Sequence, residues 1–161
     1  MARRLYGTAT LILRDGDLAH DAVQETLIQV WRNLPGLREP EAFDAWVRRI
    51  LVRQCYRAMN VRRKHRLEVD VAAIEDVGRP FDSRLDESDQ LERAFRRLSV
   101  DHRAVLVLHH REGLELAETA VALNVPVGTV KSRLNRATLA LRAAFDAEER
   151  AAATLMEGQT A

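Results

Sequence analysis

Cysteine is nearly absent from this sequence, because Cys55 is the one thiol among 161 residues. A single cysteine cannot form an internal disulfide, so a disulfide-stabilised secreted scaffold is excluded, and we expect a buried neutral thiol. No apolar run approaches the roughly 20 residues that a membrane-spanning helix needs, and the N-terminus shows no signal-peptide core. These absences predict a cytoplasmic chain without membrane insertion.

Motifs for metal, cofactor or catalytic chemistry are also missing. The five histidines are not spaced as metal ligands, since His109 and His110 are adjacent and no carboxylate–histidine motif accompanies them. Glycine-rich phosphate loops are absent, and no nucleophile and base are recognisable together. We therefore expect no metal site, no cofactor and no enzymatic activity.

Charge is unevenly distributed along the chain, although the net charge is only +1. Bases exceed acids by five over residues 1–64 and by four over residues 91–145, whereas acids exceed bases by five over residues 65–90. Residues 67–90 also contain Gly and Pro and lack sustained helical periodicity, which predicts an acidic flexible linker. Two basic blocks joined by such a linker indicate two small domains.

Acids are absent from Asn124 to Phe145, a stretch with a regular apolar stripe. At about 100° of turn per residue, one face holds the apolar residues Val130, Leu134, Ala137 and Leu141. The opposite face holds small residues and hydrogen-bond donors, with one leucine: Gly128, Lys131, Ser132, Asn135, Arg136 and Leu139. An exposed face with bases and no acids predicts a polyanionic partner. A solvated helix end, with Arg near its C-terminus, is the alternative interpretation.

A shorter helical segment precedes this stretch, with Leu116, Ala120 and Leu123 on one face. Asn124 tolerates the left-handed backbone conformation, while Pro126 cannot continue the earlier helix but suits the first turn of a new one. Two short helices across a tight break, the second bearing bases, predict a helix-turn-helix.

The first basic block also shows helical periodicity. Residues 20–34 place five large apolar residues on one face, which we expect to be buried: Val23, Leu27, Val30, Trp31 and Leu34. A different, polar face carries Asp21, Gln24 and Glu25. Solvation alone would explain that polar face.

The next helix is expected to begin near Pro40, a suitable first-turn residue, and to point Phe43, Trp46, Val47, Ile50 and Leu51 inward. Another of its faces carries Arg49, Arg53 and Arg57 at four-residue spacing, followed by the basic run of residues 60–66. Like charges at that spacing repel, which favours a partner that neutralises them. Nearby aromatic residues are typical of single-stranded nucleic-acid surfaces, although Trp46 also fits a core position.

These motifs resemble the extracytoplasmic-function class of bacterial sigma factors. The resemblance covers roughly Leu5 to Phe145 and rests on "DAVQETLIQVWRNL", "AFDAWVRRI" and, most specifically, "VPVGTVKSRLNRA". It implies an all-α fold with two small helical domains joined by an acidic flexible linker. The implied division is region 2 over residues 1–66, the linker over 67–90, region 4 with its helix-turn-helix over 91–145, and a short tail over 146–161.

The resemblance also implies a function, which is to bind core RNA polymerase and direct promoter-specific transcription initiation by recognising minus-10 and minus-35 elements. Asp21, Gln24 and Glu25 would bind the clamp helices of the largest polymerase subunit, and the flap of the second-largest subunit would be a further contact. The implied minus-10 residues are Arg49, Arg53, Arg57, Asn60, Arg62, Arg63 and Lys64. The implied minus-35 residues are Thr129, Lys131, Ser132, Arg133, Asn135 and Arg136.

Other partners and functions remain open at this point. Members of this class are commonly held inactive by an anti-sigma factor, which makes such a protein a further expected partner. The competing function is a stand-alone helix-turn-helix transcriptional regulator, although the receiver domain of alternating strands and helices that often accompanies one is missing. A sigma factor needs core polymerase to hold promoter DNA, whereas a regulator binds the duplex alone.

Overall fold

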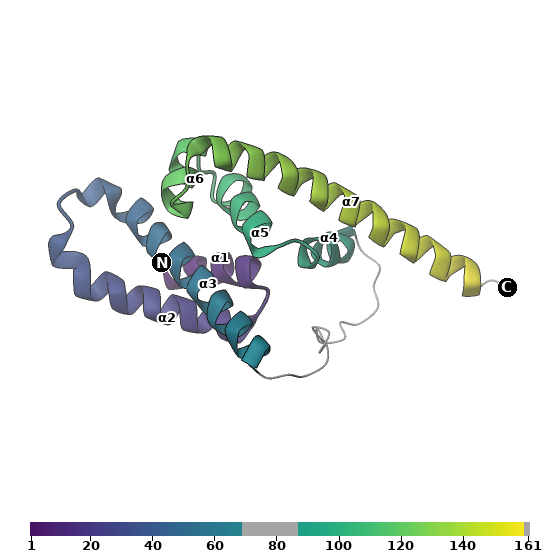
Figure 1. Ribbon diagram of the computed structural model, residues 1–161, viewed down its shortest axis with the longest axis horizontal. Helices are drawn as coiled ribbons and strands as arrows, with labels where there is room; N and C mark the ends of the chain where they lie inside the picture. The colour runs from purple at the N-terminus through teal and green to yellow at the C-terminus, as the bar shows by residue number, and fades with distance from the viewer. Residues whose placement is uncertain (69–86, 160–161) are drawn as a thin grey trace.

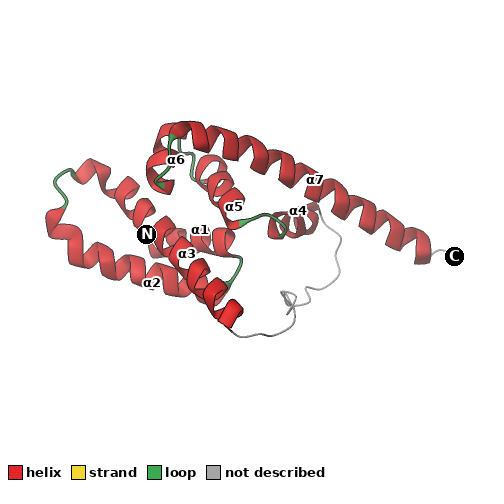
Figure 2. Ribbon diagram, in the orientation of Figure 1, coloured by secondary structure: helices red, strands yellow, loops and turns green. Residues whose placement is uncertain are grey.

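A computed structural model describes residues 1–68 and 87–159 of the protein, and the regular elements within these ranges are all helices (Figures 1 and 2). The first half contains α1 (Ala2–Leu13), α2 (Gly16–Asn33) and α3 (Phe43–Glu68). The second half contains α4 (Glu87–Arg96), α5 (Val100–Leu106), α6 (Leu116–Leu123) and α7 (Val127–Gln159). The prediction of an all-α fold is confirmed. Most of the predicted acidic linker, residues 69–86, lies outside the described residues.

Local capping interactions fix the ends of the helices in the first half. Helix α1 ends at Arg14, whose backbone is left-handed with φ 57°, and Asp15 caps α2 by accepting a hydrogen bond from the Leu18 N–H at 3.0 Å. Two short 3-10 turns, η1 (Leu34–Gly36) and η2 (Pro40–Ala42), connect α2 to α3. Proline near the start of both turns suits a first-turn position.

The break between α6 and α7 has the predicted chemistry. Glu115 and Glu118 form a reciprocal capping box at the start of α6, which satisfies two backbone N–H groups that the helix itself cannot pair. Asn124 ends α6 with φ 55° and ψ 48°. Pro126 follows, and its carbonyl accepts hydrogen bonds from the first turn of α7. The predicted left-handed Asn124 and the helix-turn-helix break are confirmed.

Helix α7 is longer than the short second helix that the sequence predicts, because it runs for 33 residues. Residues 129–157 contain neither Gly nor Pro, so nothing in them interrupts a helix. Beyond residue 145 the helix packs on α4, where the buried carboxylate of Glu148 pairs with Arg93 at 3.1 Å and with Arg97. Within residues 1–68 and 87–159, no helix combines the length and apolarity that crossing a bilayer requires.

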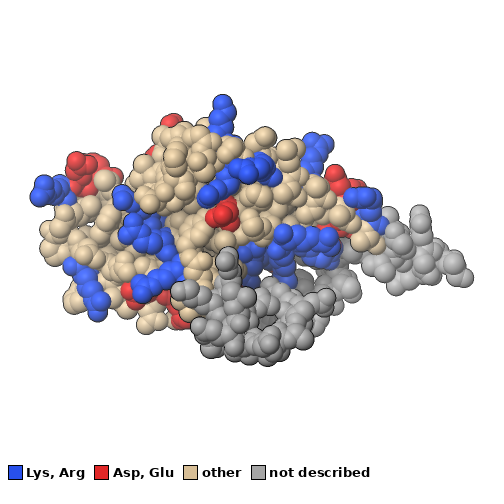
Figure 3. Space-filling view, viewed as in Figure 1, with Lys and Arg blue, Asp and Glu red and all other residues tan. Residues whose placement is uncertain are grey.

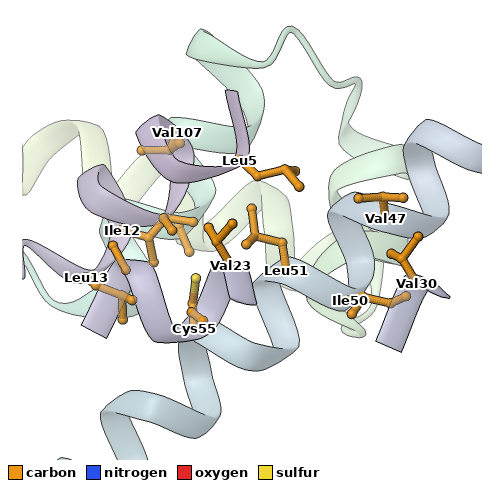
Figure 4. Close-up of a cluster of buried hydrophobic side chains, with 14 residues drawn as sticks. Leu5, Ile12, Leu13, Val23, Val30, Val47, Ile50, Leu51, Cys55 and Val107 are labelled. Carbon is orange, nitrogen blue, oxygen red and sulfur yellow. The ribbon is translucent and has the colours of Figure 1, made fainter. Parts of the chain in front are cut away.

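The main core lies among α1, α2 and α3 and receives one face of the second half (Figure 4). Ile12, Leu51 and Cys55 are completely buried there, and Val107 of the second half belongs to the same cluster. Burial raises the pKa of the Cys55 thiol to about 12, so the thiol is neutral at physiological pH. The prediction of a buried neutral cysteine is confirmed.

The two halves pack against each other along two seams (Figure 1). In the apolar seam α6 lies on α3, where Val52 is buried together with Leu108, Leu114 and Ala122 of the second half. In the polar seam α5 and the π-helical turn η3 (Val107–Arg111) lie on α1. One compact helical body results from the two predicted domains.

Hydrogen bonds from Arg103 and Arg111 cross the polar seam. Arg103 of α5 is 6% exposed, and its guanidinium donates to the Ile12 carbonyl and to the Leu98 carbonyl, both at 2.7 Å. Arg111 donates to the Gly7 carbonyl at 3.0 Å. A Cβ atom at Gly7 would lie 2.9 Å from the Arg111 guanidinium, so glycine permits this close approach.

Glu112, whose side chain is only 5% exposed, joins α1 to the end of η3 in the polar seam. Its carboxylate accepts a hydrogen bond from Thr8 Oγ1 at 2.7 Å and two from the Arg4 guanidinium at 3.0 and 2.7 Å. Burial raises the pKa of Glu112, but the hydrogen bonds from Thr8 and Arg4 outweigh burial and leave its pKa below the ordinary value. The Glu112 carboxylate is therefore more stable as an anion in the folded chain than in the unfolded chain.

We predict that the stabilising effect of the Glu112 anion depends on pH. Because its folded-state pKa lies below its unfolded value, the contribution is present above the ordinary glutamate pKa and is lost as pH falls through the folded-state value. Glu112→Gln should therefore lower the free energy of unfolding at pH 7 and make progressively less difference below about pH 4. Urea denaturation of both proteins from pH 7 to pH 3 measures this; a difference that does not change with pH would contradict it.

Candidate nucleic-acid and polymerase interfaces

The first turns of α7 present a polar face backed by core residues. Val130 and Ala137 are completely buried, and Leu134 and Leu141 pack against the same cluster. The opposite side is exposed and carries the predicted base-reading residues Lys131, Ser132, Asn135 and Arg136. The structure therefore brings four of the six predicted minus-35 residues onto one solvent-facing surface, without any acidic side chain on this stretch of helix.

Internal hydrogen bonds hold part of this surface in place. Ser132 Oγ donates to the Thr129 carbonyl at 3.0 Å, and the Arg136 guanidinium donates to the Ser132 carbonyl and to Ser132 Oγ at 3.3 and 3.4 Å. Arg136 thus lies along the preceding helical turn. These long, exposed hydrogen bonds are weak, so the guanidinium can exchange them for an acceptor on a partner.

Arg133 lies apart from the exposed face. Its side chain is 22% exposed, and its guanidinium lies 3.6 Å from a carboxylate oxygen of Asp101 on α5. Asp101 also lies close to Tyr56 of α3, whose pKa is raised by burial and then by the neighbouring Asp101 carboxylate. Arg133 is therefore occupied by an intramolecular partner on the flank of α7, and Thr129 is half-buried near the start of the helix.

Helix α3 carries a row of exposed bases. Arg49, Arg53, Arg57 and Asn60 are all exposed, as the four-residue spacing predicts. Arg62 differs, because it is half-buried and pairs with Asp15 at 3.0 Å. Arg63 and Lys64 lie outside the residues whose side chains are described.

A groove of about 780 Å³ lies beside Arg49 and Arg53, the first two arginines of the basic row on α3. It is lined by Arg49, Arg53 and Trp46 of α3, by Leu37 and Arg38 of the connection to α2, and by Val121 of α6. Trp46 is half-buried, and its ring lies 6.1 Å from that of Phe43. Sequence periodicity did not reveal this groove, because its walls come from three separate segments.

The polar face of α2 carries the residues expected to bind polymerase. Asp21 and Gln24 are exposed, and Glu25 is half-buried and accepts a hydrogen bond from the Gln29 amide at 3.2 Å. Basic side chains, by contrast, are spread over both halves of the protein, and they outnumber the acidic side chains on the face that Figure 3 shows. The structure thus places the polymerase-binding candidates and the nucleic-acid candidates on separate helices.

Two residues predicted for the buried face of α2 are on the surface. Trp31 is 78% exposed and Leu34 is 47% exposed, so this part of the core prediction is wrong. The buried side of α2 is centred on the smaller residues Ala19, Ala22 and Thr26, with Val23 and Val30. Small side chains allow neighbouring helices to approach closely. The side of α2 that carries them therefore packs into the core, and Trp31 is left on the solvent side.

The exposed Trp31 shares a surface with the polar candidates. At 100° per residue, Trp31 lies about 20° around α2 from Gln24, two turns away. A large exposed aromatic side chain beside polar residues is typical of an energetically important position in a protein–protein interface. The exposure of Trp31 marks this position as a candidate for the interface, and helical periodicity in the sequence did not reveal it.

Comparison with known proteins identifies the family of the chain. The family profile "Sigma-70 region 2" matches residues 1–66, and the profile "Sigma-70, region 4" matches residues 88–141. The chain belongs to the sigma-70 family. It is an extracytoplasmic-function sigma factor, and therefore a promoter-recognising initiation factor of RNA polymerase, as the sequence motifs predicted. This assignment favours the sigma factor over the stand-alone regulator.

Individual relatives show the extent of the similarity. This sigma factor is 33% identical over 137 residues to the ECF RNA polymerase sigma factor SigM of Mycobacterium tuberculosis, with 84% of this chain and 68% of SigM covered. Its fold is similar to that of RpoE from Bartonella quintana, solved with the anti-sigma factor NepR, at a TM-score of 0.75 and 26% identity over 90% and 91% of the two chains. CnrH, solved with the cytosolic domain of CnrY, matches at a TM-score of 0.60 and 27% identity over 89% and 80%.

The two tryptophans of this sigma factor should respond differently to substitution. Trp31→Ala should change the free energy of unfolding by less than about 0.5 kcal/mol, because the ring is exposed. Trp46→Ala should lower it by about 2 kcal/mol or more, because part of the core packs on that ring. Urea denaturation followed by circular dichroism checks both values; equal losses would contradict the placement of Trp31 on the surface.

Proposed function

We propose that this sigma factor uses three separate helical surfaces, with α2 binding core polymerase, α3 binding the minus-10 element and the start of α7 binding the minus-35 element. The observation that carries the proposal is the face of α7 on which Lys131, Ser132, Asn135 and Arg136 are exposed while Val130 is completely buried behind them. A helix with this arrangement can enter the major groove with its polar side toward base edges. Run-off transcription with core polymerase tests the whole function, and we expect initiation only when both proteins are present.

The groove beside α3 supports the minus-10 assignment. Arg49 and Arg53 supply positive charge along it, and Trp46 supplies an aromatic wall. Single-stranded nucleic acid is held by this combination, since cations attract the backbone and aromatic rings stack on bases. Arg57, Asn60, Arg62, Arg63 and Lys64 extend the proposed surface along α3.

Partners and location complete the proposal. Core polymerase would contact Asp21, Gln24, Glu25 and Trp31 through the clamp of its largest subunit, and the second half through the flap of its second-largest subunit. An anti-sigma factor is a further proposed partner, because RpoE and CnrH, which are similar in fold, were solved in complexes with NepR and CnrY. We place the protein in the cytoplasm, where the polymerase is, and assign it no enzymatic activity of its own.

The polar face of α2 should determine the affinity for core polymerase. The double variant Asp21→Ala with Gln24→Ala should weaken binding to core about 10-fold or more while leaving helical content nearly unchanged, because both side chains are exposed. Trp31→Ala should weaken binding to a similar extent. The matched control is Asp146→Ala with Glu149→Ala, two exposed acids on α7. Undiminished core affinity in the α2 variants would remove this face from the proposal.

Arg136 and Arg133 should contribute to DNA binding in different ways. Arg136→Ala should cost about 1–3 kcal/mol at the cognate minus-35 element and relax the preference at one or two base positions. Arg133→Ala should weaken binding evenly across sequences, and Asp101→Asn, which frees Arg133 from its carboxylate partner, should strengthen it evenly. Holoenzyme binding to a set of minus-35 variants at several salt concentrations measures all three. A change in base preference from Arg133→Ala but not from Arg136→Ala would contradict this orientation of α7.

A further inference from the structure

Leu139 is an exposed apolar side chain on the polar face of α7. It is 60% exposed, whereas the next two residues, Ala140 and Leu141, pack against the apolar cluster of the second half. At 100° per residue, Leu139 lies about 180° around the helix from Val130, which is completely buried. Leu139 therefore stands in the middle of the polar face, where most of its side chain meets solvent instead of the core.

The neighbours of Leu139 on this face include two of the proposed base-reading residues. Asn135 and Arg136 precede it by four and three residues, and Arg142 follows it by three, spacings at which side chains adjoin on a helix surface. All three neighbours are exposed, and residues 124–145 contain no acidic side chain. A nucleic acid that covers Asn135 and Arg136 would therefore also cover Leu139.

Base edges in the major groove offer one apolar group to such a leucine. The edges of guanine, cytosine and adenine present hydrogen-bond donors and acceptors there, whereas thymine adds its C5-methyl group. Contact between a leucine and a methyl group removes apolar surface of both from water, which is favourable. Contact with a polar edge would instead displace water from donors or acceptors without replacing its hydrogen bonds. The chemistry of Leu139 thus matches a thymine.

The position of Leu139 along α7 gives it a base pair of its own. At 1.5 Å per residue, Leu139 stands about 6 Å beyond Asn135 along the helix axis. This distance corresponds to roughly two base pairs at about 3.4 Å each, when the helix follows the groove. Leu139 and Asn135 therefore do not compete for the same base.

We infer that Leu139 is a specificity-determining residue of the minus-35 surface and contacts the C5-methyl group of a thymine, roughly two base pairs from the pair that Asn135 meets. This inference rests on the proposed function, because it places the same face of α7 in the major groove. It adds an apolar contact to a surface whose other exposed candidates, Lys131, Ser132, Asn135 and Arg136, read bases through hydrogen bonds.

Replacement of thymine by uracil tests this contact, because deoxyuridine keeps the base pair and removes only the methyl group. Run-off transcription and mapping of start sites first identify a cognate promoter. Each thymine of its minus-35 element, on either strand, is then replaced singly, and binding of the holoenzyme to each fragment is measured. One replacement should weaken binding of the unmodified protein about four-fold, which is the contribution of one buried methyl group.

Variants at position 139 assign the effect to the leucine. In Leu139→Ala the same replacement should make no difference, whereas Leu139→Met, which keeps an apolar side chain of similar volume, should retain the sensitivity. The matched control is Leu91→Ala on α4, since Leu91 is also an exposed leucine, at 48%, and it should leave the sensitivity unchanged. Circular dichroism checks that helical content is preserved, as expected for exposed positions.

The possible failures are distinguishable from failure of the proposed function. A minus-35 element without thymine, no effect of any replacement, or an equal effect in Leu139→Ala would overturn the thymine contact. Weaker binding of Leu139→Ala to core polymerase without DNA would also overturn it, by assigning the leucine to a protein contact. In each case the proposed function stands if Arg136→Ala relaxes the base preference in the same assay. If Arg136→Ala leaves the base preference unchanged, the placement of α7 in the groove fails, and the thymine contact fails with it.

Discussion

The position of the second half depends on Arg103, a buried cation that donates hydrogen bonds to Ile12 at the end of α1 and to Leu98 before α5. Burying a guanidinium is costly unless carbonyl or carboxylate oxygens accept its hydrogen bonds. The arrangement in which α1 lies against α5 supplies such an acceptor from the other half. With α5 fixed on α1, the short turn that follows brings α6 onto α3, and the apolar seam around Val52 and Leu114 closes beside it.

This packing leaves each proposed functional surface on a different helix and facing solvent. The polar side of α2 carries Gln24 beside the exposed Trp31, α3 presents its arginine row, and α7 presents Arg136 with its neighbours. A sigma factor must contact polymerase and two DNA elements, and separate helices allow these contacts to form without competing for one surface. The same packing places Val121 of α6 in the groove that Arg49 and Arg53 of α3 line.

Local chemistry made much of this fold predictable from the sequence. The left-handed Asn124, the break at Pro126 and the stripe of Val130 and Ala137 follow from backbone preferences and helical periodicity, and all three are observed. Val23 and Val30 are buried as predicted, but Trp31 and Leu34 were wrongly assigned to the core, because large apolar residues dominate a hydrophobic pattern whereas small residues contribute much of the real contact. The contact of Glu112 with Arg4 joins positions 108 residues apart, and no local pattern could have revealed it.

Site-specific cross-linking from the two DNA surfaces is the most direct test that this chain reads two promoter elements. A photoreactive amino acid is placed at Ser132 in one protein and at Arg53 in another, and each is assembled with core polymerase on the same promoter fragment. We predict that position 132 cross-links near −35 and position 53 near −10, about 25 base pairs or roughly 85 Å apart. Cross-links from both positions to one short segment, or scattered without preference along the fragment, would contradict the account.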